Sequence, residues 1–182
     1  MEELDFVGPF EILSYINKIE PHSTKVLLVS ENDKYITAFN GMKVLPETTF
    51  EDCPPLDILI VPGGNGRIEA MKNPKIKNFI LKQSKNIKYI TSICTGVFIL
   101  AETGLLTGKR VTTHHAALSE LEKYLEIKVE KAKVLQDGNV ITCAGVSSGI
   151  EFGFYLLNLL FGGELAQTVA KKIEYDIDVN NI

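Results

Sequence analysis

Short apolar runs alternate with helix-like segments along most of the chain. Three runs rich in branched and aromatic residues predict buried strands, namely Lys25–Ser30, Asp57–Val61 and Lys88–Ile93. Pro74–Ser84 predicts a helix that begins at Pro74, because proline suits the first turn of a helix. Another helix is expected directly after Cys94, ending at Gly104. Strands that are apolar throughout and alternate with helices indicate a parallel sheet covered on both faces.

The second half of the chain continues this pattern. Its expected elements are a short strand, a helix, the two strands of a hairpin and two further helices: Lys109–Thr112, Ala116–Tyr124, Ile127–Leu135, Val140–Cys143, Glu151–Phe161 and Leu165–Tyr175. Asp137-Gly138-Asn139 supplies the turn of the hairpin. No repeat or Pro/Gly/Ser-rich linker interrupts the chain. Residues 1–182 are therefore expected to form one α/β domain of the doubly wound type, with helices on both faces of a mostly parallel sheet.

The N-terminal segment departs from the usual order of such a fold. Leu4–Ile16 (LDFVGPFEILSYI) predicts a turn and a helix with no strand before it. Doubly wound folds usually begin with a strand near the centre of the sheet. The sheet is therefore expected to lack its usual first strand.

Composition excludes several classes of protein. With 182 residues, of which 45% are hydrophobic and 23% charged, the chain has the make-up of a globular domain rather than a disordered segment, a fibre or a disulfide miniprotein. Its net charge of -4 lacks the basic excess of a general nucleic-acid binder. No apolar run reaches the roughly 18 residues of a membrane span, and the acidic start does not resemble a signal peptide. We expect a cytoplasmic protein with neither a membrane nor a nucleic-acid partner.

The few cysteines and histidines do not indicate a metal site. They are Cys53, Cys94, Cys143, His22, His114 and His115. No CxxC spacing occurs, so neither a metal site nor a redox pair of cysteines is expected. Three cysteines, an odd and small number, also argue against a secreted disulfide framework. Cys143, inside a predicted strand, is expected to pack in the core, and Cys53, before two prolines, to lie in a loop.

Cys94 is distinguished by its position between a predicted strand and a predicted helix. A sharp turn at such a junction raises a side chain above the sheet, as in a nucleophile elbow. The free N–H groups and dipole at the helix start favour a thiolate there. The alternative is a buried, inert thiol, which is common for free cysteines.

Two further segments reach the same end of the sheet, where ligands bind in this fold class. The loop Pro62-Gly63-Gly64-Asn65-Gly66 either offers backbone N–H groups to an anion or is a plain turn. Asp5, flanked by apolar residues, either caps the first helix or, with its pKa raised by burial, carries a proton beside the thiol. His114 and His115 follow a strand end and lie near the pocket only if the fold directs them there.

These segments resemble the DJ-1/PfpI superfamily, and within it the isonitrile hydratases. The shared motifs are Ser92-Ile93-Cys94-Thr95-Gly96, Pro62-Gly63-Gly64 and Leu4-Asp5-Phe6-Val7-Gly8-Pro9, with further likeness at Phe50–Pro62, Ala101–His114 and Asp137–Phe152. The resemblance spans nearly the whole chain and implies a fold like that of flavodoxin and class I glutamine amidotransferases. The effector domains of AraC-type regulators share most of these motifs, but those regulators carry a C-terminal DNA-binding domain, which we do not expect in a chain that ends at Ile182.

The resemblance assigns roles to particular residues. It places the nucleophile on Cys94, its neighbouring threonine on Thr95 and the acidic partner on Asp5, where DJ-1 and the PfpI proteases carry glutamate. The peptidase branch has histidine directly after the cysteine, so Thr95 argues against proteolysis. Where the hydratases often have Thr-Thr-His-Trp, this chain has a second histidine, His115. The family also places a strand before the acidic loop, and we expect the coding sequence upstream of Met1 to supply it.

The implied reaction is hydration of an isonitrile to an N-substituted formamide by a lyase that needs no metal or organic cofactor. Cys94 would attack the terminal carbon while Asp5 delivers a proton, giving a thioimidate that water then hydrolyses. Thr95 and backbone N–H groups at Gly63 and Gly64 would position substrate or water, and Ile93 and Val146 would line the pocket. The alternatives are a non-catalytic ligand-binding or redox-sensing module and glyoxalase-like or amidase-like chemistry. The family also implies a homodimer.

Overall fold

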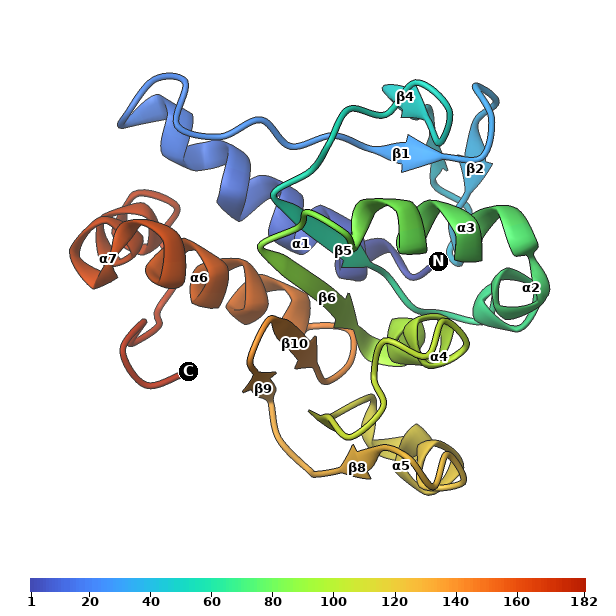
Figure 1. Cartoon of the computed structure of the whole chain (residues 1–182). Coiled ribbons are helices and arrows are strands. Elements are labelled where there is room, and N and C mark those ends of the chain that lie inside the picture. Colours follow the sequence, from blue (N-terminus) through green and yellow to red (C-terminus); the bar gives the residue numbers. More distant parts are fainter.

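A four-stranded sheet lies at the centre of the computed structural model, which describes residues 1–182 (Figure 1). Its strand order is β5–β6–β10–β9, formed by Ile58–Val61, Tyr89–Ile93, Val140–Cys143 and Val134–Asp137. The first three strands are parallel, and β9 pairs with β10 in the antiparallel sense. The predicted doubly wound, mostly parallel α/β fold is confirmed.

Helices cover both faces of this sheet because alternate strand residues enter two separate cores. On one face lie α1 (Glu3–Tyr15), α6 (Ser148–Phe161) and α7 (Gly163–Lys172), packed on side chains such as Ile93 and Ile141. On the other lie α2 (Arg67–Lys72), α3 (Pro74–Gln83) and α4 (Val97–Ala101), packed on side chains such as Leu59 and Ile90. Figure 1 shows α6 and α7 on one side of the sheet and α3 and α4 on the other. None of the helices has the length and apolar character of a membrane span.

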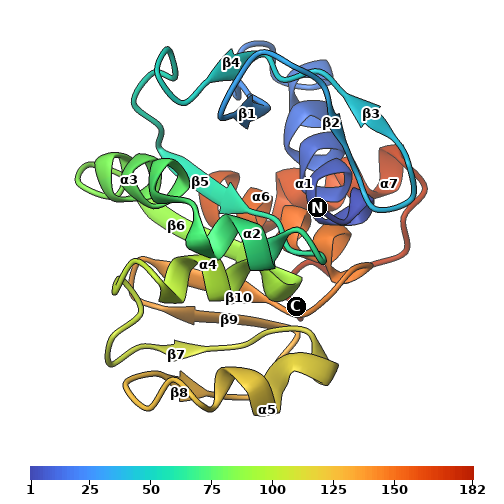
Figure 2. The same cartoon turned by 90° about the vertical axis from the view of Figure 1, so that its right-hand side faces the viewer.

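Short strand pairs flank the main sheet on both sides (Figure 2). They are β1 (Val29–Ser30) with β4 (Thr48–Thr49), β2 (Ile36–Thr37) with β3 (Lys43–Val44), and β7 (Arg110–Val111) with β8 (Lys128–Val129). Strand β5 is paired with β6 alone, so one of its edges carries no strand. The predicted strand Lys25–Ser30 is accordingly reduced to two paired residues, because β1 has a partner only in β4.

Two local predictions are wrong, and one helix was not predicted. The expected helix Ala116–Tyr124 is a 3₁₀ turn, η3 (His115–Ala117), followed by the single-turn α5 (Leu118–Leu121). The expected strand Ile127–Leu135 is divided, because its start leaves to pair with β7 while its end pairs with β10. Helix α2 was not predicted, because it has only six residues and fully buries none of them, which leaves a weak apolar pattern in the sequence.

Candidate active site

Cys94 forms the predicted elbow at the end of β6. Its φ of 55° lies in the left-handed region, and the 3₁₀ turn η2 (Cys94–Gly96) leads from it directly into α4. A methyl group on Gly96 would overlap the carbonyl oxygen of Val61, so the tight turn requires glycine at that position. Thr113 Oγ1 donates to the Cys94 carbonyl at 2.8 Å and fixes the turn from the opposite side. The side chain is buried, with 6% of the residue exposed.

Burial makes this thiol less acidic than its position at the elbow suggested. Desolvation and the neighbouring Asp5 carboxylate raise the pKa of Cys94, and backbone N–H groups of Thr95 and Val146 with the Thr95 hydroxyl oppose them. Val146 has a φ of 37°, a strained value for a β-branched residue. The expectation that the helix start alone favours the thiolate is therefore outweighed by burial.

Asp5 faces this thiol from α1 and does not cap the helix. The N-cap position belongs to Glu2, which makes no side-chain capping bond, and Asp5 lies in the first turn. It is fully buried; its Oδ2 accepts a hydrogen bond from the Gly63 N–H at 2.9 Å, while Oδ1 has no partner. Desolvation raises the pKa of Asp5 to about 7 against the opposing Gly63 bond. A carboxyl group with this pKa can both give and take a proton near neutral pH.

The glycine loop holds the two polar side chains of the site. Gly63 N–H binds Asp5, and Gly64 N–H donates to Thr95 Oγ1 at 3.0 Å. A methyl group on Gly63 would lie 2.5 Å from the Thr95 nitrogen, so the loop can approach the elbow only with glycine there. Both N–H groups are thus engaged by side chains and are not directed at an open anion site, which was one of the two roles that the sequence left open for this loop. The Thr95 hydroxyl links Gly64 to the Cys94 sulfur.

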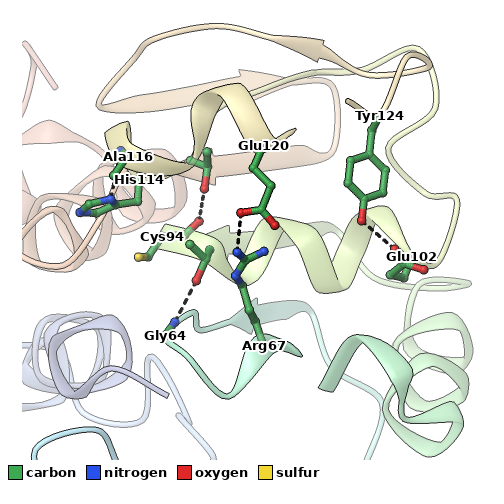
Figure 3. A network of polar contacts seen from close by, with 10 residues as sticks. Gly64, Arg67, Cys94, Glu102, His114, Ala116, Glu120 and Tyr124 are labelled. Atoms are coloured by element: carbon green, nitrogen blue, oxygen red, sulfur yellow. Dashed lines mark hydrogen bonds and ion pairs between the residues drawn. The ribbon is translucent and has the colours of Figure 1, made fainter. Parts of the chain in front are cut away.

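The fold also brings His114 to the thiol. Its Nδ1 accepts from the Ala116 N–H at 3.3 Å, which assigns the ring proton of the neutral form to Nε2. A methyl group on Gly145 would overlap the His114 ring and lie 3.1 Å from the Cys94 sulfur, so both groups border Gly145. Figure 3 shows the ring beside the sulfur. Burial and the neighbouring His115 ring, tilted against His114 with its centroid 4.2 Å away, lower the pKa of His114.

Of the remaining residues that the sequence analysis named, some border the site and others lie in the hydrophobic core. Val146 contacts the site through its N–H group, whereas Ile93 is fully buried among core side chains. Cys143 packs in the core and Cys53 lies in a loop, as predicted. A cavity of about 410 Å³ beside Gly145 is lined in part by His115, Thr113 and Lys131. No three His, Cys, Asp or Glu side chains are grouped closely enough to hold a metal ion.

Sequence reasoning missed a set of polar contacts behind the elbow, formed by Arg67, Glu102, Glu120 and Tyr124 (Figure 3) together with Thr113. Arg67 and Glu120, which pair in this network, lie 53 residues apart in the sequence, and Glu120 belonged to a stretch interpreted as solvated surface. The one feature of the sequence that could have indicated these contacts is Arg67, a basic residue directly after the glycine loop.

A buried thiol at a strand-to-helix elbow, faced by a buried carboxyl group from the first helix, defines a doubly wound α/β protein of the nucleophile-elbow class. The chain belongs to the DJ-1/PfpI family, whose profile matches residues 1–159.

Individual relatives support this assignment. The chain is 38% identical over 175 residues to an isonitrile hydratase of Pseudomonas putida, covering 96% of this chain and 74% of that protein. It is 32% identical over 130 residues to the Parkinson disease protein 7 homolog of Danio rerio, covering 69% of each. The crystal structure of a THiJ/PfpI family protein from Pseudomonas syringae superposes with a TM-score of 0.89 at 31% identity, covering 98% of this chain and 72% of that one.

Proposed function

We propose that this protein hydrates isonitriles to N-substituted formamides, with Cys94 as nucleophile and Asp5 as proton carrier. The observation that carries the proposal is Asp5, which is fully buried beside the thiol with one oxygen fixed by Gly63 and the other unpartnered. Similarity to an isonitrile hydratase supports the same reaction. Hydration of an isonitrile by this route requires a thiol and a carboxyl group that can exchange one proton.

In the first step the S–H group adds across the terminal isonitrile carbon. Asp5 takes the proton from Cys94 as the sulfur–carbon bond forms, and returns it to the same carbon. The product is a thioimidate, Cys94–S–CH=N–R, and Asp5 is again a carboxylate. The N–H groups of Thr95 and Val146 and the Thr95 hydroxyl stabilise the sulfur while it carries negative charge.

In the second step water replaces the sulfur. Asp5 takes a proton from water as its oxygen adds to the thioimidate carbon, and this proton passes to the nitrogen. The tetrahedral intermediate then expels the Cys94 sulfur, which recovers the hydroxyl proton and leaves R–NH–CHO. Gly63 keeps Asp5 oriented in both steps, and no metal or organic cofactor takes part in this scheme.

The test is formamide production from a simple aryl isonitrile. Wild-type protein should turn over, and Cys94→Ala and Asp5→Asn should not. Full turnover in Cys94→Ala would exclude the mechanism. Lactate from methylglyoxal and ammonia from simple amides, measured with the same samples, test the glyoxalase-like and amidase-like alternatives.

We further propose that the protein acts as a cytoplasmic homodimer on a small-molecule substrate, as the family resemblance implies. Light scattering at micromolar concentration measures the subunit number, and a clean monomer would exclude the dimer. A redox-sensing role has less support, because an oxidation sensor needs an exposed thiol of low pKa, whereas Cys94 is buried and its pKa is raised.

A further inference from the structure

We propose that Arg67 is a positioning residue for the Cys94 site, acting through its ion pair with Glu120 on the far side of the elbow helix. The inference rests on the proposed function for its activity readout only. It concerns how the glycine loop and the turn after His114 are held against the elbow.

Arg67 is the first residue of α2 and follows Gly64 by three positions. Its Nη2 lies 2.6 Å from Glu120 Oε2, and its guanidinium carbon lies 4.1 Å above the ring of Phe98. The side chain is only 14% exposed, although that of Glu120 is 48% exposed. A planar cation stacked on an aromatic ring and paired with a carboxylate is an arrangement that arginine makes and lysine does not reproduce.

The aromatic ring under Arg67 is that of Phe98, which lies in α4, the helix that follows the Cys94 elbow. Phe98 is fully buried in α4, four residues after Cys94, and its ring meets that of Tyr124 edge to face at 6.1 Å. The Tyr124 hydroxyl donates to Glu102 Oε1 at 2.7 Å. Arg67 therefore rests on a ring whose orientation is fixed from the side opposite the thiol.

Glu120 connects the pair to the histidine turn. It lies in α5, which directly follows the turn η3 that begins after His114. The ion pair thus joins α2, behind the glycine loop, to α5, behind the histidine turn, and both stand on α4 (Figure 3).

On the side of the thiol, each of these loops is tied to the elbow by one hydrogen bond. Gly64 N–H binds Thr95 Oγ1 at 3.0 Å, and Thr113 Oγ1 binds the Cys94 carbonyl at 2.8 Å. Helix α2 fully buries none of its residues and packs on the core through the partly buried side chains of Ala70 and Met71, so the largely buried side chain of Arg67 anchors the first turn of this helix, next to the glycine loop. Loss of the anchor should let Gly64 move, so that the Thr95 hydroxyl no longer points at the sulfur.

The experiment compares Arg67→Gln, Glu120→Gln and Arg67→Lys with wild type. The matched control is Lys72→Gln, which removes an exposed ion pair with Glu69 from the same helix. Site-resolved alkylation of Cys94 by iodoacetamide, followed by mass spectrometry across pH, reports the thiolate directly. Isonitrile hydration gives kcat and KM.

We expect both Gln variants to move the alkylation midpoint of Cys94 to higher pH, because the thiolate loses its Thr95 donor. Asp5, with its pKa of about 7, is already ionised at the higher pH values where Cys94 loses its proton, so its own titration does not contribute to the alkylation midpoint. We expect kcat to fall by about tenfold with KM nearly unchanged. Arg67→Lys should recover part of both effects, and Lys72→Gln should match wild type.

The inference would be overturned if Arg67→Gln and Glu120→Gln both kept the alkylation midpoint and the kcat of wild type. It would also be overturned if Lys72→Gln shifted both quantities as much as these two variants do. If Arg67→Gln fails to fold, Glu120→Gln, altered at a half-exposed side chain, decides the question. If wild-type protein hydrates no isonitrile, the proposed function fails while the alkylation midpoints still test the role of Arg67.

Discussion

Replacing Asp5 with asparagine tests the electrostatics of the site through stability as well as activity. In the folded protein the pKa of this carboxyl group is raised from 3.8 to about 7, with burial as the largest cause. Between those two values the folded state holds the proton and the unfolded chain releases it, so stability falls as pH rises through this window. The difference corresponds to about 4 kcal/mol lost between pH 4 and pH 8.

Asparagine is nearly isosteric with the protonated carboxyl group and does not ionise. Its amide oxygen can keep the bond from Gly63, while its NH₂ group takes the unpartnered position of Oδ1 at a cost of about 1–3 kcal/mol. Asp5→Asn should therefore be more stable than wild type by about 1–3 kcal/mol at pH 8, although we expect it to lose activity. At pH 4, where wild-type Asp5 is neutral, only the cost of the amide remains, and the variant should be less stable than wild type by about 1–3 kcal/mol.

The assay is urea unfolding of both proteins from pH 4 to pH 8.5. Other ionisable groups are common to both, so the difference between the curves isolates residue 5. Asp33→Asn, the same substitution at an exposed position, is the control and should follow wild type. Parallel stability curves for wild type and Asp5→Asn would refute a raised pKa at Asp5, and with it the proton-carrier role.

Three further predictions concern the elbow and the loop beside it. Cys94→Ala should lose at least about a thousandfold in turnover while remaining folded, as checked by circular dichroism. Gly63→Ala should lose about tenfold or more in kcat because its methyl group meets the Thr95 backbone, whereas Gly66→Ala, whose methyl group has room, should retain activity; equal activities would contradict the close-approach argument. Peroxide should oxidise Cys94 more slowly than free cysteine at pH 7, as followed by intact mass, because burial and Asp5 oppose the thiolate.

The parts of the site that sequence could predict are those set by local pattern. The apolar runs ending at Val61 and Ile93, each followed by small residues, were enough to locate two parallel strands and the elbow at Cys94. Strand direction then places both loops at one end of the sheet. The resemblance added Asp5, which its neighbours alone had suggested to be a helix cap.

The parts that sequence could not predict depend on contacts between distant segments. Asp5 and Gly63 are 58 positions apart, and no periodicity indicates that the loop N–H would bind the carboxylate rather than a ligand. The pairing of Arg67 with Glu120 likewise appears only when α2 and α5 stand on the same helix. Strand β1 shows that a local pattern can also predict too much. Lys25–Ser30 has the composition of a strand, but only Val29–Ser30 form one, because β1 pairs with the two residues of β4 and with no strand of the main sheet.

The unpaired edge of β5 also has a consequence for how the protein opens. No ladder joins the β1–β4 and β2–β3 pairs to the main sheet, and only Ser30 and Ala38 are buried between residues 20 and 50. This segment should therefore behave as a separate foldon, with a free energy of local unfolding well below that of the sheet. In hydrogen exchange its amides should be labelled first, followed by the outward-facing amides of β5, while β6 and β10 should exchange only through global unfolding.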